Sequence, residues 1–347
     1  MSQPDETIRD AKNISIPKYL IMTVLTIFSI GPQYFLNLSY TLNQVVIQNG
    51  LHLTTGDMRM PSIFSNLAFA LGVPLGRVLS RRFGIRNSYL AFIFVFLYGS
   101  LIDAFSAGLI SLIVGRVIQG LSAGMLFLTI LPVKLVSFPN KFRHLFLFFV
   151  ITGLFGASAL GAVFGSLSLS ADTWRWVFIL NICSPILCLV IGFLTLPKQA
   201  SAQRVNHSID KTGVFLLSLL MIVLAVPFIH LQESGFHSLY VWPFFLAAFI
   251  LLGLFIMTDL RAEHPLVPFH SLWTAKSVSG TIMAVVSHIA LIVALAGDIH
   301  QASKRSVSLH FIRNFAGAAA APVLGWFASM KNTVHYETIR GDISPLI

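Results

Sequence analysis

Long apolar segments, separated by short polar ones, follow one another along most of the chain. A helix needs about 20 mainly apolar residues to cross the hydrocarbon core of a bilayer. Ten segments come close to that length: 19–40, 63–79, 89–105, 109–133, 145–167, 176–196, 214–229, 241–258, 278–296 and, more weakly, 311–328. The pattern therefore predicts an all-α, polytopic membrane protein with about ten spans.

The composition agrees with this prediction and excludes several other classes of protein. Of 347 residues, 56% are hydrophobic and only 10% are charged, whereas a soluble domain has about 25% charged residues. A water-soluble enzyme, a disordered chain and a nucleic-acid binder do not have this composition. The two cysteines, Cys183 and Cys188, lie five residues apart in one apolar segment. They do not share a helix face, so we expect packing rather than a disulfide framework.

The net charge of +10 is distributed unevenly between the connections. Fifteen Lys and Arg residues fall in the N-terminal tail and in alternate connections as far as residue 276. On the opposite side, up to residue 297, there are only Arg59 and Arg175. Basic connections stay in the cytoplasm, which predicts a multi-pass protein of the inner (plasma) membrane with a cytoplasmic N-terminus. The first ten residues are polar, so we expect no signal peptide and an uncleaved first span.

Basic and small residues recur at characteristic spacings in the first six spans. The connection after the second span contains Arg82, Gly84 and Arg86. Residues 112–124 of the fourth span follow Leu-x-x-x-Arg-x-x-x-Gly-x-x-x-Gly, with Arg116 as the arginine. The fifth span contains Gly161 and Gly165, and residues 174–178 before the sixth read Trp-Arg-Trp-Val-Phe.

Together these motifs resemble the major facilitator superfamily, and specifically its 14-span branch of drug:proton antiporter-like exporters. The resemblance covers about residues 20–297. Four positions depart from the family pattern: Arg77 stands where the family has glycine, Arg81 where it has an acidic residue, Ala162 where it has proline, and Ser166 where it has glycine.

The resemblance implies a major facilitator-type helical bundle whose second half is incomplete. Residues 1–16 would be a cytoplasmic tail, 17–197 an N-terminal six-helix bundle, 198–211 a cytoplasmic linker, 212–260 an extra central helix pair, and 261–347 a partial C-terminal bundle. A complete 14-span member needs about 500 residues at roughly 20 per span plus loops. Residues 301–317 and His335 resemble the thirteenth span and the following loop, so we hypothesise an internally deleted and truncated transporter.

The residues expected along the substrate or proton pathway are Arg116, Gln119, Asn37, Tyr40 and His288. A charge inside a membrane span is costly and by default functional, and the family places the Arg116 arginine near this pathway; the alternative is an arginine that only packs helices. Residues expected to act in the conformational change are Arg82, Gly84, Arg86, Gly161 and Gly165. The two last also form a GxxxG pair, for which close helix packing is the alternative role.

Acidic residues for proton transfer are scarce. In the family an aspartate near the end of the first span takes part in proton handling, at about Asn37 or Ser39 here. We place Asp57, Asp103, Asp172, Glu233 and Asp298 at span ends or in loops, so no acid is expected in the interior of a span up to residue 297. A membrane proton relay normally uses Asp, Glu or His. Asp57 and His288 are then the candidate proton carriers.

The aromatic residues are assigned by position alone. Trp174 and Trp176 flank the start of a span, where aromatic residues anchor a helix at the membrane interface. Phenylalanines such as Phe92, Phe94 and Phe96 are assigned to the lipid-facing surface.

The sequence favours a secondary active transporter that exports drug-like or small amphipathic compounds, with protons and a small-molecule substrate as its partners in the bilayer. It contains no nucleotide loop, metal-ligand spacing or nucleophile motif, so we expect neither an enzyme nor a cofactor. Two alternatives stay open: a transport-inactive truncated remnant or helix-pairing scaffold, and a homodimer in which two copies supply the missing half.

Overall fold

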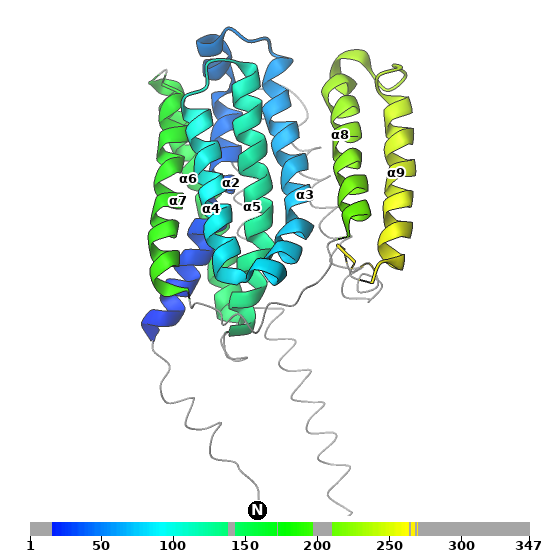
Figure 1. The fold of residues 1–347 in the computed structure, drawn as a ribbon. Helices are drawn as coiled ribbons and strands as arrows, with labels where there is room; N and C mark the ends of the chain where they lie inside the picture. Colours follow the sequence, from blue (N-terminus) through cyan, green and yellow to red (C-terminus); the bar gives the residue numbers. More distant parts are fainter. Residues whose placement is uncertain are drawn as a thin grey trace, which may run out of the picture. The chain divides into compact units, whose positions relative to one another are not determined.

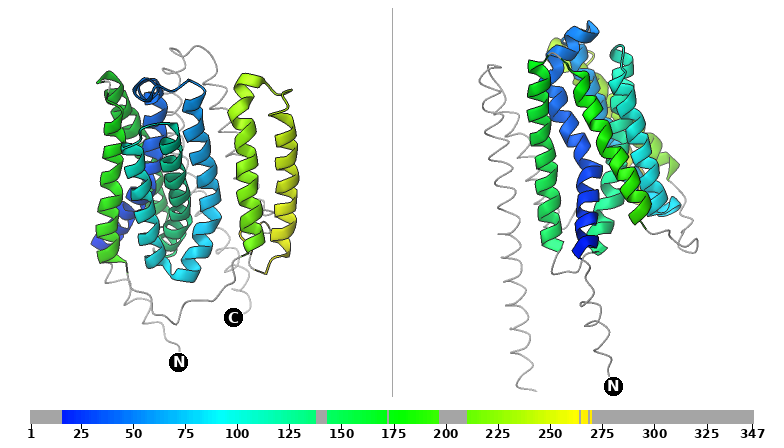
Figure 2. Two further views of the ribbon diagram at one scale, coloured as in Figure 1. Left: turned by 45° about the horizontal axis from the view of Figure 1, so that its top comes forward. Right: turned by 90° about the vertical axis from the view of Figure 1, so that its left-hand side faces the viewer.

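The computed structural model describes residues 16–137, 143–171, 173–196, 210–263, 265–267 and 269. They contain eight long helices: α2 (Ile16–Leu51), α3 (Met60–Phe83), α4 (Ile85–Ala104), α5 (Leu109–Ser137), α6 (Arg143–Ser170), α7 (Arg175–Thr195), α8 (Lys211–Ser234) and α9 (Trp242–Arg261). A short 3-10 helix, η2 (Asp57–Arg59), precedes α3. Figures 1 and 2 show these helices as a set of long, roughly parallel rods.

All eight helices are long and apolar enough to cross a membrane. The first eight predicted spans are therefore confirmed as helices, and the protein is an all-helical, multi-pass membrane protein. The last two predicted spans, 278–296 and 311–328, lie outside the described residues. The chain divides into two compact units, of which the first comprises residues 1–137 and 156–269. The second contributes to the described structure only the beginning of α6, residues 143–155.

The predicted end of the first span at residue 40 is wrong, because α2 continues to Leu51. Beyond residue 40 the helix carries polar side chains, which made that segment resemble a loop. Asn43 shows why a helix is stable there: its amide donates to the carbonyl of Ser39 at 2.8 Å and to that of Gly165 on α6 at 2.9 Å. These contacts satisfy the amide nitrogen of the buried Asn43, whereas its Oδ1 has no hydrogen-bond partner among the described residues.

Helices α3 and α5 lie side by side at unusually close range (Figure 1). Four glycines make the approach possible. A side chain on Gly72 or Gly76 would collide with the backbone of α5 at residues 121 and 125, and one on Gly120 or Gly124 with the backbone of α3 at residues 65 and 69. Small residues at helix interfaces permit such backbone contact.

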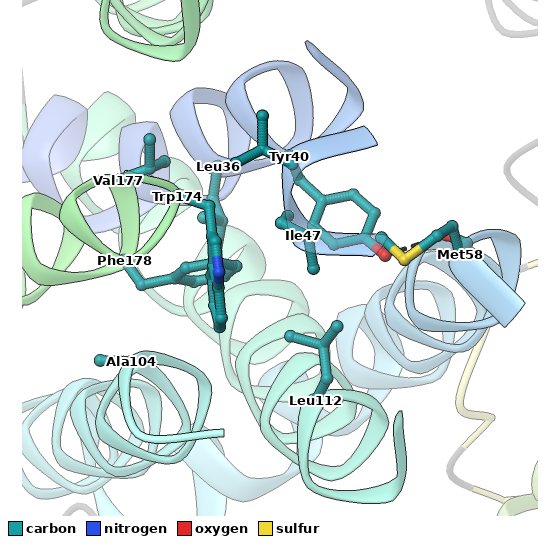
Figure 3. Close-up of a cluster of buried hydrophobic side chains, with 10 residues drawn as sticks. Leu36, Tyr40, Ile47, Met58, Ala104, Leu112, Trp174, Val177 and Phe178 are labelled. Carbon is teal, nitrogen blue, oxygen red and sulfur yellow. Dashed lines mark hydrogen bonds between the residues drawn. The ribbon is translucent and has the colours of Figure 1, made fainter. Parts of the chain in front are cut away.

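The main apolar core of the first unit lies near the end of the bundle where α4 turns into α5 (Figure 3). It contains Leu36, Tyr40, Val46, Ile47, Met58, Ala104, Leu112, Trp174, Val177 and Phe178. Trp174 packs edge-to-face on Phe178, with ring centroids 5.8 Å apart. The core joins α2, α4, α5 and α7 and adjoins the polar residues of the candidate site, because Tyr40 belongs to both.

Two assignments of aromatic residues are corrected by this packing. Trp174 is only 4% exposed and belongs to the core, whereas Trp176 is 60% exposed, as an interface anchor would be. Phe92 and Phe96 are buried, and Phe94 alone of the three faces outward. The error arises because an apolar span has no polar stripe from which its inner face can be read.

Helices α8 and α9 form a hairpin with its own apolar contacts. Asp210 caps the start of α8, accepting a hydrogen bond from the Gly213 amide at 2.9 Å, as expected of an N-cap aspartate. Leu217 and Leu220 of α8 cluster with Phe255 of α9. This hairpin corresponds to the predicted seventh and eighth spans.

Candidate functional site: a buried polar cluster

Arg116 lies on α5 and is fully buried, with no exposed surface. Its Nη2 donates a hydrogen bond of 2.7 Å to Oδ1 of Asn37 on α2. Its guanidinium carbon lies 5.1 Å from the centre of the Tyr40 ring, within the range of a cation–π contact. Nε and Nη1 have no hydrogen-bond partner among the described residues. A buried cation is thus held by one hydrogen bond and one aromatic face.

The residues of α2 that face Arg116 recur at helical spacing. Asn37 lies one turn after Gln33, whose Nε2 is 3.4 Å from Asn37 Oδ1 and 3.2 Å from the Ser65 hydroxyl of α3. Tyr40 follows, and its hydroxyl donates to the carbonyl of Met58 at 2.9 Å. One face of α2 therefore presents an amide, a second amide and a phenol to the interior, as the i, i+4, i+7 spacing requires.

Gln119 lies one turn beyond Arg116 and contacts a different helix. Its Nε2 donates to the Ser100 hydroxyl of α4 at 2.9 Å, and its Oε1 has no partner among the described residues. Gly99 provides the space, because a side chain there would meet both Gln119 and the backbone of α5. Gln119 thus extends the polar cluster toward α4.

Asp103 also belongs to this cluster, which the sequence analysis did not foresee. It lies in the last turn of α4 rather than in a loop, and its side chain is fully buried. Electrostatic attraction links it to Arg116, and neither carboxylate oxygen has a hydrogen-bond partner within the described chain. Asp103 thus lies at a span end, where the sequence placed it, but its side chain is buried inside the bundle.

Asp57, the other acid considered, takes no part in the cluster. It is partly exposed, and its Oδ2 accepts hydrogen bonds from the Thr54 amide at 2.9 Å and from the Thr54 hydroxyl at 2.7 Å. These bonds close the turn before η2, which accounts for the residue structurally. His288 lies outside the described residues. Across the residues that the structure describes, no group of three His, Cys, Asp or Glu side chains could hold a metal ion.

Three of the residues expected to act in the conformational change, Arg82, Gly84 and Arg86, lie where α3 turns into α4. Gly84 makes the turn with φ 84°, a conformation that glycine adopts without strain. Arg86 then donates from Nη2 to the carbonyl of Phe193 at 2.9 Å, with its guanidinium 5.0 Å from that ring. It therefore ties the start of α4 to the end of α7. Arg82 is exposed and lies beside the Phe83 ring at 5.6 Å.

Gly161 and Gly165 bring α6 against α2. A side chain on Gly161 would collide with the carbonyl of Phe35, and one on Gly165 would press on Ser39. This GxxxG pair therefore packs closely against α2, and its role in the conformational change stays a prediction. The hydrogen bond from Asn43 to the Gly165 carbonyl then locks the two helices in register.

The family model described as Major Facilitator Superfamily matches residues 20–336. The chain belongs to this superfamily. It is accordingly a member of a membrane transporter family and not of an enzyme family. The motifs around Arg82, Arg116 and Gly161 all lie within the matched region, so the broad resemblance stated from the sequence is confirmed.

Several curated members of the superfamily are similar to the chain. An uncharacterized MFS-type transporter, YubD, of Bacillus subtilis is 29% identical over 314 residues, covering 88% of this chain and 61% of that protein. The tetracenomycin C resistance and export protein of Streptomyces glaucescens is 29% identical over 241 residues, covering 69% and 44%. The multidrug export protein EmrB of Haemophilus influenzae is 26% identical over 266 residues, covering 74% and 50%. The chain thus spans about half the length of these relatives.

The chain also shows a more remote likeness to a solved structure. The crystal structure of a variant of the peptide transporter POT in complex with sulfate gives a TM-score of 0.47 at 17% identity, covering 80% of this chain and 56% of that chain.

The superfamily motifs recover most of the described cluster but not all of it. Arg116, Asn37 and Tyr40 are brought together as predicted, and Gln119 lies one turn away. Asp103 was missed because it ends an apolar run. A signal was present: the connection from residue 105 to residue 108 is so short that α5 must run back along α4, which places the end of one helix beside the first turns of the other.

Proposed function

We propose that the chain acts as a secondary active transporter that exports drug-like or small amphipathic compounds in exchange for protons. Membership of the superfamily supports transport, and relatives named as exporters of tetracenomycin C and of multiple drugs support the direction and the substrate class. The observation that carries the proposal is Arg116, a fully buried cation with two nitrogens lacking partners among the described residues. An ionisable group at such a position is costly unless it serves a function.

The proposed arrangement places the protein in the plasma membrane with its N-terminus in the cytoplasm. The end of the first unit that carries Arg81, Arg82 and Arg86 would then face the cytoplasm, following the distribution of basic residues. The end with the connection from α4 to α5 would face outward. The six-helix bundle 17–197 would hold the cluster, with the pair 212–260 beside it.

The proposal is tested in inside-out vesicles energised with a proton gradient, using ethidium as the probe. We expect wild-type vesicles to accumulate ethidium and to release protons when it is added. Arg116→Ala should reduce both signals at least tenfold. Arg261→Ala, at an exposed arginine in the last turn of α9, is the control and should transport normally.

Failure of transport in well-inserted wild-type protein, across a panel of amphipathic cations, would refute the proposal. That result would favour the alternative, a membrane protein that pairs with other helices without transporting. Equal transport by the Arg116→Ala and Arg261→Ala variants would leave Arg116 with a packing role only.

A further inference from the structure

Asp103 is a buried acid in a part of the molecule where the superfamily motifs do not place one. It belongs to the last turn of α4 and has no exposed surface. Its backbone carbonyl accepts hydrogen bonds from the Ser106 hydroxyl at 2.9 Å and from the Ser106 amide at 3.2 Å, so Ser106 caps the end of the helix. The two carboxylate oxygens, in contrast, have no donor within the described residues. The carboxyl group is therefore not used to stabilise the turn.

Gly115 determines where the carboxyl group lies. A Cβ atom at residue 115 would overlap Oδ1 of Asp103 and would also meet its backbone nitrogen. The carboxyl group thus rests directly against the backbone of α5, at the residue that precedes Arg116. Only a glycine at 115 leaves room for it.

The charged and titratable groups around Asp103 are few. From α5 Arg116 attracts it, and from α2 the Tyr40 phenol faces the same region, with its hydroxyl donating to Met58. From α7 Arg175 reaches the carbonyl of Ser106 at 3.0 Å. Helix α3 carries no titratable side chain between Met60 and Gly76, and on α4 itself the Tyr98 ring faces outward.

Burial and the neighbouring arginine have opposite effects on whether the carboxyl group of Asp103 holds its proton. Burial without a hydrogen-bond donor disfavours a carboxylate, whereas the positive charge of Arg116 favours it. Arg116 is held by Asn37 through a single nitrogen, while its Nε and Nη1 are unengaged by the described residues. A movement of the guanidinium away from Asn37 and toward Asp103 would therefore favour the charged form of Asp103.

We propose that Asp103 is the proton-binding carboxyl group of this transporter, with Arg116 as the cation that governs its release. On binding, a proton from water forms an O–H bond with one carboxylate oxygen, and the side chain becomes neutral. On release, the guanidinium approaches the carboxyl group and the proton returns to water. This role rests on the proposed function, since it supplies the acid that proton exchange requires.

The first experiment needs no substrate, so it tests Asp103 independently of transport. The full chain is reconstituted in lipid nanodiscs, and infrared difference spectra are recorded as the pH is varied. We expect a carbonyl-stretch band of a protonated carboxyl group that appears and disappears with pH. Asp103→Asn should abolish this band, and Asp103→Ala should do the same if the asparagine variant is poorly folded. Asp57→Asn, which removes a partly exposed carboxyl group near the same end of the bundle, should leave it intact.

The outcomes separate cleanly. A band that persists in both Asp103 variants, or one that vanishes in Asp57→Asn instead, would overturn the proposal, as would the absence of any titrating band in wild-type protein.

The second experiment measures proton release on addition of ethidium in the vesicles. We expect at least a tenfold loss in Asp103→Asn and none in Asp57→Asn; undiminished release from Asp103→Asn would overturn the role. If wild-type protein shows the titrating band but does not transport ethidium, the proposed function fails while the proton site stands.

Discussion

At the scale of single residues, the polar cluster is held by unusually few contacts. The only hydrogen bond that Arg116 makes among the described residues goes to Asn37 Oδ1. Because Arg116 is buried, removing its one acceptor would leave the cation without the contact that offsets the loss of its hydration. Asn37 should therefore contribute more to stability than an ordinary polar residue of a membrane helix.

Asn37→Ala is expected to lower the stability of the folded protein by about 1–3 kcal/mol, the usual cost of leaving a buried polar group unsatisfied. The measurement is thermal unfolding of purified protein in detergent. Thr41→Ala is the matched control, because it lies one turn further along α2, is exposed and bonds only to the Asn37 carbonyl of its own helix. Equal effects of the two substitutions would contradict the importance assigned to the contact with Arg116.

Arg116, Asn37 and Tyr40 could be predicted from the sequence because charged and polar residues inside an apolar run are visible without any structure. Asp103 could not be read in the same way. It lies at the end of an apolar run, where most acids face water, and its burial depends on Gly115 of the neighbouring helix. Hydropathy along the chain does not show that a glycine on one helix makes room for a side chain of the neighbouring helix.

At the scale of helices, the presence of each span could be predicted from the sequence, but the residue at which a helix ends could not. The eight described spans follow from apolar length, which is a local property. The continuation of α2 from residue 40 to Leu51 depends on the carbonyl of Gly165 as a partner for Asn43, and that partner comes from another helix. The inner faces of the helices were likewise hidden, since Phe92 and Phe96 are buried and Phe94 is exposed on an evenly apolar helix.

Gly120→Ala tests the close approach of α3 and α5. The added methyl group would overlap the carbonyl of Ser65, and because that atom belongs to the backbone, the helices must separate. We expect a loss of about 1–3 kcal/mol or more, as in other overpacked interiors, measured as a lower thermal midpoint and a smaller yield of monodisperse protein. Gly253→Ala on α9 is the control: nothing lies within 4 Å of its added methyl group, and alanine favours a helix by about 1 kcal/mol over glycine. A Gly120→Ala variant as stable as Gly253→Ala would show that the interface can relax.

At the scale of the whole molecule, the charge distribution and the polar cluster together suggest a direction. The arginines at residues 81, 82 and 86 gather where α3 turns into α4, whereas Asp103 lies in the last turn of α4, at the other end of that helix. If the arginine-rich end faces the cytoplasm, the acid lies near the outer surface. Protons that drive export would then reach Asp103 from the side on which they are abundant.

This orientation is tested with single cysteines in a chain whose Cys183 and Cys188 are replaced by alanine. Gly108→Cys lies in the connection from α4 to α5, where nothing surrounds the added side chain, and Asn87→Cys lies at an exposed position in the first turn of α4. In intact cells a membrane-impermeant maleimide should label the cysteine at position 108, while the cysteine at position 87 should react only after permeabilisation. The expectation follows from the cost of moving arginines across the bilayer, about 2.5–3.5 kcal/mol each at a helix centre. Labelling at position 87 but not at position 108 would invert the orientation, and Asp103 would then have to take its proton from the cytoplasm, which is incompatible with proton-driven export.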